Sequence, residues 1–569
     1  MMRCHVTCCL ALGLAAFIFV SCAPIARAAD NPFAGNWKVT LLLPGQDITV
    51  FLVEIKSADG KTEGKVLSAG IDQLAKDAKV DSIKADGGKS LQITVSGGGI
   101  TFPMVVYVPK GEAKPEKLLG SVDFRGRQLA HLERTEDKEL DPKKASVKNP
   151  NVNAFGKAMG TPDAKEKQTA LKEFLATKDL EPALAYLSGL ELLGAMAENG
   201  VDKDEVVKQA GETVKLAAAY GPEMKLTAQQ QAAKNLSGSE KLAPVAVDLA
   251  RDAEKALDKN TPTGLQVAVL STLKTALLKA GKAAEAKELT PKIAGLNDQL
   301  DQEFLKDAVP FKTEALTRKE KGERVVLVEL FTGAQCPSCV AADVAFDAML
   351  KSYKPADVVF LQYHLHIPGP DALTNEDSIK RMEFYKIRGT PTYFLDGAEG
   401  PQAGGGKGDG KDRYTELVKS VGDAIEVGAQ AKIKLSAENK DGKVDIHVEV
   451  SDLSKAGDFI KLRLVLVEEM ARYPGSNGQR LHHHVVRAFP GGVGGIALKQ
   501  KSTKHDIRVE LGDVKKNLND YLANFKGAKF AEDERPLDLK HLKIVAFIQN
   551  DDGDKDIFQA AQIDLPGEK

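Results

Sequence analysis

The 569-residue sequence has few cysteines, almost no excess of either charge and a single long hydrophobic run. Lysine and arginine number 78 and aspartate and glutamate 80, so the formal charge of −2 argues against a dedicated nucleic-acid surface. The hydrophobic run, Leu10–Val20, is too short to span a bilayer. With 43% hydrophobic and 28% charged residues, a chain of this length is expected to form three or four soluble globular domains.

The N-terminus has the pattern of a secretory signal. Arg3 precedes the apolar Leu10–Val20, and Ala26-Arg27-Ala28 offers a small-x-small cleavage site. We therefore expect residues 1–28 to be a signal peptide and the mature protein to be exported to the periplasm, the cell envelope or the medium. Cys22 resembles a lipoprotein acylation site, so membrane attachment at that residue stays open as an alternative.

Cysteine is scarce outside this signal segment. Removal of residues 1–28 leaves Cys336 and Cys339 out of six cysteines, so one intramolecular disulfide is available. Closing a four-residue loop stabilises a fold by about 1.9 kcal/mol, against about 4.7 kcal/mol for a hundred-residue loop. Such a disulfide is better explained by reactivity than by stabilisation.

The residues around this pair suit a reactive thiol. A buried strand, Val325–Phe331, is predicted to deliver Cys336 to the start of the helix Val340–Tyr353, where free N–H groups and the helix dipole favour a thiolate. Pro337 suits the first helical position, which needs no N–H donor. At such a place the pKa of a thiol falls from about 8.5 to roughly 3.5–7.5. Cys339 lies one turn further on, where it could resolve a mixed disulfide at Cys336.

Three further regions surround this one. Residues 30–136 contain short alternating runs separated by glycine turns, which predicts an all-β, small barrel-like domain. Its Gly35-Asn36-Trp37 opening resembles that of lipocalin-like barrels, with Trp37 as a core anchor. After a charged linker, residues 162–312 predict an all-α region of helical hairpins, an irregular array suited to spacing or protein contact. Residues 429–569 predict a C-terminal β-sandwich.

Residues 319–428 resemble the thioredoxin fold. Two motifs carry the resemblance: Cys-Pro-Ser-Cys at Cys336–Cys339, opening the first helix of a β-α-β-α-β-β-α order, and Gly389-Thr390-Pro391-Thr392 before a strand. The resemblance implies a multidomain protein with an α/β thioredoxin-like domain. It also implies a cis bond between Thr390 and Pro391, which lie against the dithiol and line the groove where a substrate chain docks.

The resemblance leaves two points open. Gln335 stands where the family typically has Trp, and Pro337-Ser338 replaces Gly-Pro, so the direction of electron flow is not implied. Glu329 resembles the buried carboxylate that assists proton transfer from the second cysteine, Cys339. The alternative is a strand carboxylate that is paired or points to solvent.

We expect an exported thiol–disulfide oxidoreductase in which Cys336 forms the mixed disulfide and Cys339 resolves it. Its partners would be protein thiols and disulfides and a second dithiol protein, with no nucleic acid, no cofactor and no metal. The sequence sets no oligomeric state. One alternative is an envelope binding or scaffold protein with an inert thioredoxin-like module. Another is a copper-delivery protein in which His364 and His366 join the cysteines.

A run of three histidines, His482-His483-His484, could suggest a second metal site. On a strand, the first and third would share one face and the second would point to the other. Two imidazoles without a neighbouring carboxylate make an incomplete site, so the sequence favours no metal there.

Overall fold

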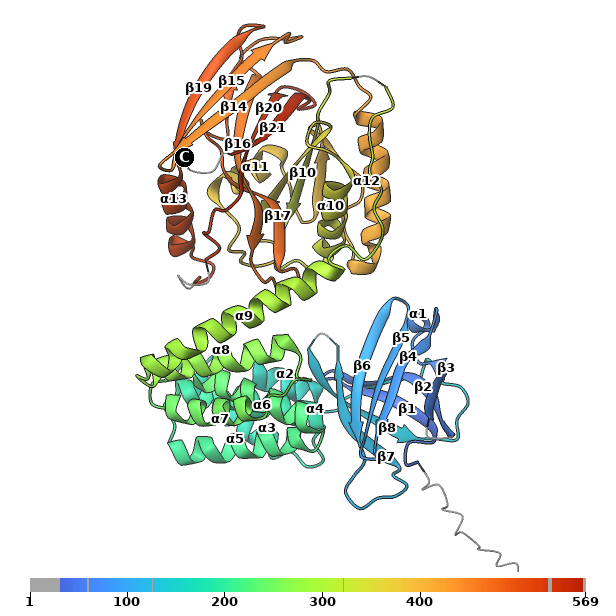
Figure 1. The fold of residues 1–569 in the computed structure, drawn as a ribbon. Helices are drawn as coiled ribbons and strands as arrows, with labels where there is room; N and C mark the ends of the chain where they lie inside the picture. The colour runs from blue at the N-terminus through green and yellow to red at the C-terminus, as the bar shows by residue number, and fades with distance from the viewer. Residues whose placement is uncertain (1–30, 59–60, 125, 321, 531–534, 566–569) are drawn as a thin grey trace, which may run out of the picture. The chain divides into compact units, whose positions relative to one another are not determined.

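The computed structural model describes residues 31–58, 61–124, 126–320, 322–530 and 535–565 (Figure 1). The signal peptide expected at residues 1–28, with Cys22, lies outside these residues. The chain forms two compact units, Met1–Leu296 and Asn297–Lys569, of mixed α and β structure. No helix in the described part of the chain has both the length and the apolar character needed to cross a membrane.

The first unit begins with a near-closed, barrel-like antiparallel sheet. Its strands follow the order β3-β2-β1-β8-β7-β6-β5-β4, with β9 paired to β2, and Gly64 of β3 lies against Val80 and Ile83 of β4. The elements are β1 (Gly35–Leu42), β2 (Gln46–Ala58), β3 (Lys61–Ala69), α1 (Asp72–Ala75), β4 (Lys79–Asp86), β5 (Ser90–Gly97), β6 (Ile100–Tyr107), β7 (Lys117–Asp123), β8 (Arg127–Arg134) and β9 (Ser146–Lys148).

Trp37 is a core anchor of this sheet, as predicted. Its side chain is fully buried, and its indole Nε1 donates to the carbonyl oxygen of Phe33 at 2.7 Å. The guanidinium of Arg134 lies 4.3 Å from the centre of the ring and donates to the carbonyl oxygen of Ala34 at 2.6 Å. Gly35 has a φ of 130°, and any side chain there would collide with Arg134, so only glycine fits.

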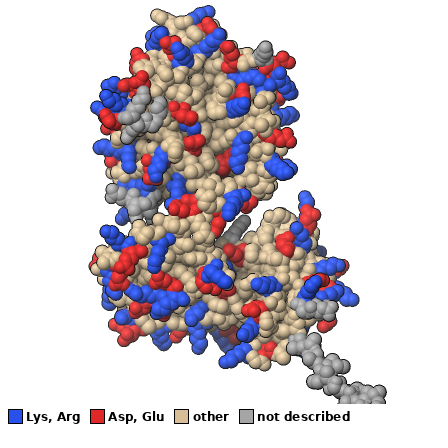
Figure 2. Space-filling view, viewed as in Figure 1, with Lys and Arg blue, Asp and Glu red and all other residues tan. Residues whose placement is uncertain are grey.

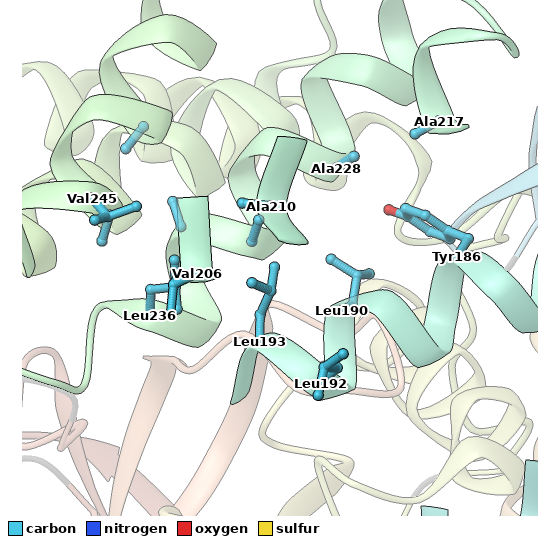
Figure 3. Packing of buried hydrophobic residues seen from close by; sticks show 14 of the residues in the cluster. Tyr186, Leu190, Leu192, Leu193, Val206, Ala210, Ala217, Ala228, Leu236 and Val245 are labelled. Atoms are coloured by element: carbon cyan, nitrogen blue, oxygen red, sulfur yellow. The ribbon is translucent and has the colours of Figure 1, made fainter. Parts of the chain in front are cut away.

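A helical array completes the first unit. Its apolar side chains interdigitate in one core, which includes Leu190, Leu193, Val206 and Leu236 (Figure 3). The helices are α2 (Val152–Met159), α3 (Ala164–Leu175), α4 (Pro182–Glu198), α5 (Lys203–Ala218), α6 (Pro222–Leu236), α7 (Ala243–Lys255), α8 (Thr263–Lys279) and α9 (Ala283–Asp307), the last crossing into the second unit. The segment between residues 137 and 161, predicted to be a linker, contains β9 and α2.

The barrel and the array meet at Tyr107. Its hydroxyl donates to the carboxylate of Glu223 at 2.5 Å, and its ring fills the space beside Gly221, which has a φ of 106°. A methyl group at that glycine would overlap the ring. This contact fixes the start of α6 against β6.

The second unit is built on a nine-stranded sheet in the order β13-β12-β10-β11-β17-β16-β20-β21, with β18 paired to β16. A smaller sheet has the order β14-β15-β19. The elements are β10 (Val326–Thr332), η1 (Pro337–Cys339), α10 (Val340–Ser352), β11 (Val358–His364), α11 (Glu376–Tyr385), β12 (Thr392–Leu395), β13 (Ala398–Glu399), η2 (Lys407–Asp409), α12 (Gly410–Ala424), β14 (Lys432–Lys440), β15 (Lys443–Ser451), β16 (Ile460–Arg472), β17 (Leu481–Ala488), β18 (Ile496–Ala497), β19 (Thr503–Glu510), α13 (Leu511–Asn524), β20 (Leu542–Asn550) and β21 (Ile557–Asp564).

The two faces of β10 pack against different elements. Val326, Val328 and Leu330 share a core with α10 and α12. Leu327 and Phe331 point to the opposite face, where they share a core with α11 and with β16, β17 and β20. Both faces are therefore buried, which explains why the sequence of this strand is an unbroken apolar run apart from one glutamate.

The C-terminal strands do not form the separate sandwich domain that the sequence predicts from residue 429. β17 pairs in parallel with β11, with Gln362 opposite Val485, so strands from both predicted domains form one sheet. β14, β15 and β19 pack against β16 and β20 through one apolar core. Sequence patterns could not show this pairing, because it joins residues more than a hundred positions apart.

Charged side chains cover the visible surface of each unit without segregation. Figure 2 shows Lys and Arg interspersed with Asp and Glu. This distribution agrees with the formal charge of −2.

Candidate functional site

Cys336 and Cys339 form a disulfide at the start of α10, with their Cα atoms 5.3 Å apart. β10 ends at Thr332, and the following residues, 333–339, are named here the cysteine turn. Cys336 has extended φ and ψ angles of −98° and 106°, and Pro337 then occupies the first position of the short helix η1, which leads directly into α10. The placement predicted from the sequence for these residues is confirmed.

The disulfide is recessed beneath the residues that it encloses. Cys336 is 2% exposed and Cys339 is fully buried, whereas Pro337 and Ser338 between them are exposed. Cys336 is thus the more exposed of the two cysteines.

Thr390 and Pro391 lie beside Cys336. Their peptide bond is cis, as predicted, and the Thr390 carbonyl oxygen is 3.8 Å from the Cys336 sulfur. The Thr390 hydroxyl donates to the carbonyl oxygen of Ile367 at 3.3 Å, which ties this segment to the loop after β11. The structure thus brings together four of the five residues that the sequence singled out.

Glu329, the fifth, lies apart from the disulfide. Strand alternation turns its side chain to the α11 face of the sheet, away from α10. There it accepts from Arg381 at 2.9 Å on each oxygen, from the Tyr363 hydroxyl at 2.9 Å and from the Tyr385 hydroxyl at 2.6 Å. The arrangement corresponds to the paired strand carboxylate that the sequence left as the alternative.

A different carboxyl group lies on the α10 side. Asp343 follows Cys339 by one helical turn and is buried. Its Oδ1 accepts from the Thr332 hydroxyl at 2.9 Å and from the Gln362 amide at 3.1 Å, and its Oδ2 has no hydrogen-bond partner among the residues that the structure describes. Burial raises the pKa of Asp343 to about 8, which means that the carboxyl is protonated at neutral pH. The sequence signal for it was an aspartate in the apolar first half of the predicted helix, one turn after Cys339.

A second buried acid holds the cysteine turn directly. Asp371 accepts from the backbone N–H of Ala334 at 2.7 Å and of Leu373 at 2.8 Å, and it pairs with His364 Nδ1 at 2.8 Å. Burial alone would raise its pKa, but His364 and the two N–H donors outweigh burial, so the pKa of Asp371 is lowered. His364 is thereby committed to Asp371 and, through Nε2, to Gln362 at 3.3 Å.

The other histidines weighed as metal ligands have separate partners. His366 Nε2 lies 3.0 Å from the Tyr521 hydroxyl. In the run on β17, His482 contacts the Tyr473 carbonyl oxygen, His483 the Asp347 carboxylate and His484 the Phe360 carbonyl oxygen. Within the described ranges, no group of three or more His, Cys, Asp or Glu residues is arranged to hold a metal ion.

Sequence reasoning missed Asn477 as part of the site. Its amide Nδ2 lies 3.3 Å from the carbonyl oxygens of Gly333 and Cys336, and its backbone N–H donates to Ala334 at 3.2 Å. It belongs to a turn-rich segment, Tyr473–Gly478, but nothing in that segment indicates which part of the chain it covers.

Comparisons with known proteins assign no family. No protein-family model matches the sequence, and no curated protein matches it. Among solved structures, HBP35 of Porphyromonas gingivalis is 18% identical with a TM-score of 0.31, over 44% of this chain and 78% of that one. The alkylpurine DNA glycosylase AlkC of Pseudomonas fluorescens, bound to DNA containing an abasic site analog, is 11% identical with a TM-score of 0.15, over 73% and 93%. Similarities at this level carry no inference about fold or function.

Proposed function

We propose that this protein is an exported thiol–disulfide oxidoreductase that exchanges disulfides with other proteins through Cys336 and Cys339. The observation that carries the proposal is the placement of their disulfide at the start of α10, with the Thr390 carbonyl oxygen 3.8 Å from the Cys336 sulfur. A bridge this short adds little stability, whereas a helix N-terminus favours the thiolate needed for exchange.

We also propose a thioredoxin-like fold for residues 319–428. The element order β10-α10-β11-α11-β12-β13-α12 supports it, as does the Thr390–Pro391 segment that precedes β12 beside the cysteines. In this chain the fold would be extended by β17, β16, β20 and β21, which continue the same sheet.

In the reducing direction, the Cys336 thiolate attacks one sulfur of a substrate disulfide. The substrate S–S bond breaks, its leaving thiolate takes up a proton, and a mixed disulfide forms. Cys339 then loses its proton and attacks the Cys336 sulfur, which releases the second substrate thiol and closes the Cys336–Cys339 bond. Two electrons and two protons pass to the substrate. A second dithiol protein then supplies two electrons and two protons to the Cys336–Cys339 disulfide and restores the dithiol. The oxidising direction is the reverse.

The first experiment measures the reduction potential of the pair together with the pKa of Cys336 in the reduced protein. A potential between roughly −120 and −270 mV with a lowered pKa supports an exchanging enzyme. Cys339→Ser should then accumulate a mixed disulfide with a substrate protein, whereas the matched Cys336→Ser variant should not.

A binding or scaffold protein with an inert disulfide is the second candidate, and the 2% exposure of Cys336 favours it. A potential below about −300 mV, with Cys336 unreactive toward alkylating agents, would decide for this candidate. Export itself is tested separately, by determining the N-terminal residue of the secreted product and whether Cys22 carries a lipid.

A further inference from the structure

The loop between β16 and β17, residues 473–480, covers the cysteine turn. Its Asn477 makes three hydrogen bonds to that turn. The backbone N–H donates to the Ala334 carbonyl oxygen at 3.2 Å, and the side-chain Nδ2 donates to the carbonyl oxygens of Gly333 and Cys336, each at 3.3 Å. The residue therefore fixes the backbone of Cys336 from outside, although the two lie 141 positions apart in the sequence.

The amide group of Asn477 is held in one orientation. Its Oδ1 accepts from the backbone N–H of Gln479 at 3.0 Å, and since an N–H can only donate, Nδ2 must face the two carbonyl oxygens. Gly475 donates to the Gln479 carbonyl oxygen at 2.7 Å, which closes the loop on itself. A side chain at Gly475 would collide with the Ala334 carbonyl oxygen, so glycine permits the close approach.

The other end of the loop is anchored in the buried network under the turn. Burial lowers the pKa of His482 to about 3, so its ring is neutral, and Nε2–H donates to the Tyr473 carbonyl oxygen at 2.9 Å. The ring meets His364 edge-on, with centroids 4.7 Å apart, and His364 holds Asp371, which binds the Ala334 N–H. The cysteine turn is thus held by Asp371 at the Ala334 N–H and by Asn477 at its carbonyl oxygens.

We propose that Asn477 is a positioning residue of the dithiol, and that it sets the reduction potential of the Cys336–Cys339 pair; this inference rests on the proposed exchange function. In the oxidised protein the S–S bond itself keeps the two Cα atoms 5.3 Å apart. In the reduced protein that bond is gone and Cys336 is kept in place by its packing and by the hydrogen bonds to the cysteine turn, so the loss of Asn477 loosens the dithiol more than the disulfide. The effective concentration of one thiol at the other falls, and the disulfide becomes easier to reduce.

The test uses the full chain with Asn477→Ala and Asn477→Ser. Both remove the amide, with its two hydrogen bonds to the turn and the one that Oδ1 accepts from Gln479, and both leave the backbone hydrogen bond to Ala334. Each variant is equilibrated in glutathione buffers, and dithiol and disulfide are separated by alkylation. We expect the equilibrium constant for disulfide formation to fall about three- to tenfold, a potential about 14–30 mV less negative. Gly475→Ala, whose methyl group would meet both the Ala334 carbonyl oxygen and the Asn477 Oδ1, displaces the loop together with its amide and should shift the potential in the same direction. Ser476→Ala, at an exposed position of the same loop, is the matched control and should leave it unchanged.

The two proposals fail in different ways. If both Asn477 variants fold, as judged by the thermal unfolding of the oxidised protein, and their equilibrium constants stay within about twofold of wild type, the positioning role is refuted while exchange stands. If the wild-type pair lies below about −300 mV and does not react with protein substrates, the exchange function is refuted. The equilibrium constants of the variants can still be compared in that case, because they are measured with small thiols.

Discussion

The buried pair of Glu329 and Arg381 allows a test of whether Glu329 is a paired strand carboxylate or assists proton transfer from Cys339. Both side chains are buried, and the carboxylate accepts four hydrogen bonds, two from Arg381 and one each from Tyr363 and Tyr385. In Glu329→Gln, the amide NH₂ must face at least one of these donors, and the guanidinium loses its neutralising charge. Removing one partner of such a pair costs about 3–5 kcal/mol, so we expect that loss in the free energy of unfolding of the second unit.

Two probes distinguish the units in a urea titration. The single tryptophan, Trp37, lies in the first unit, so its fluorescence should give the same transition in both proteins. The alkylation of Cys339, which is fully buried in the folded protein, reports the second unit when the protein is reduced, and there the transition should move to lower urea concentration. Replacing both partners of the pair by methionine should cost less than Glu329→Gln, because no buried charge is then left unpaired.

The same variant tests the proton-transfer hypothesis. Since Glu329 faces α11 and the cysteines face α10, the pH profile of thiol–disulfide exchange in Glu329→Gln should match wild type where both proteins are folded. Glu468→Gln is the matched control, because it breaks another buried pair of this unit, with Arg487. A pH profile displaced in Glu329→Gln but not in Glu468→Gln, or a destabilisation below about 1 kcal/mol, would refute the assignment of Glu329 to the opposite face and its pairing.

Two further substitutions test buried features of each unit. Burial raises the pKa of Asp343 from 3.8 to about 8, so the stability that its protonated carboxyl contributes is full below about pH 4 and is lost as the pH rises toward 8. Relative to Asp343→Asn, the free energy of unfolding of wild type should fall by about 5 kcal/mol across that range. Parallel stability profiles of the two proteins would contradict this. Gly221→Ala should destabilise the first unit by about 2–4 kcal/mol, because its methyl group would overlap the Tyr107 ring and its φ is positive. The control, Gly211→Ala, lies in open space on α5 and should stabilise the unit by about 0.5–1 kcal/mol. Trp37 fluorescence in urea measures both changes, and equal effects would contradict the contact between Gly221 and Tyr107.

The features that sequence reasoning predicted correctly are those set by neighbouring residues. Pro337 begins the helical turn after Cys336, because a residue without an N–H suits that position. Trp37 is a core residue, in line with the packing role of aromatic side chains. The cis bond at Thr390–Pro391 was predicted by resemblance, from a motif four residues long.

The features that sequence reasoning missed depend on which side of a strand or helix a residue faces. β10 is buried on both faces, so its apolar run gives no alternation from which the direction of Glu329 could be read. The partners that settle the question lie far away in the chain: the Arg381 guanidinium is also bound by Gln549, 168 positions later, on a strand that was expected to belong to another domain. Residues of one predicted domain thus complete the polar core of another.

Residues of the C-terminal strands and loops also hold the cysteine site. The carbonyl oxygens of the cysteine turn are held by Asn477, and the opposite face of the strand that leads to it is packed by β16, β17 and β20. A fragment that ends at residue 428 would therefore leave the Glu329–Arg381 pair without Gln549 and the cysteine turn without its outer hydrogen bonds. If such a fragment folds at all, its dithiol should be less constrained than that of the full chain. The C-terminal strands and the loop between β16 and β17 are therefore part of the cysteine site.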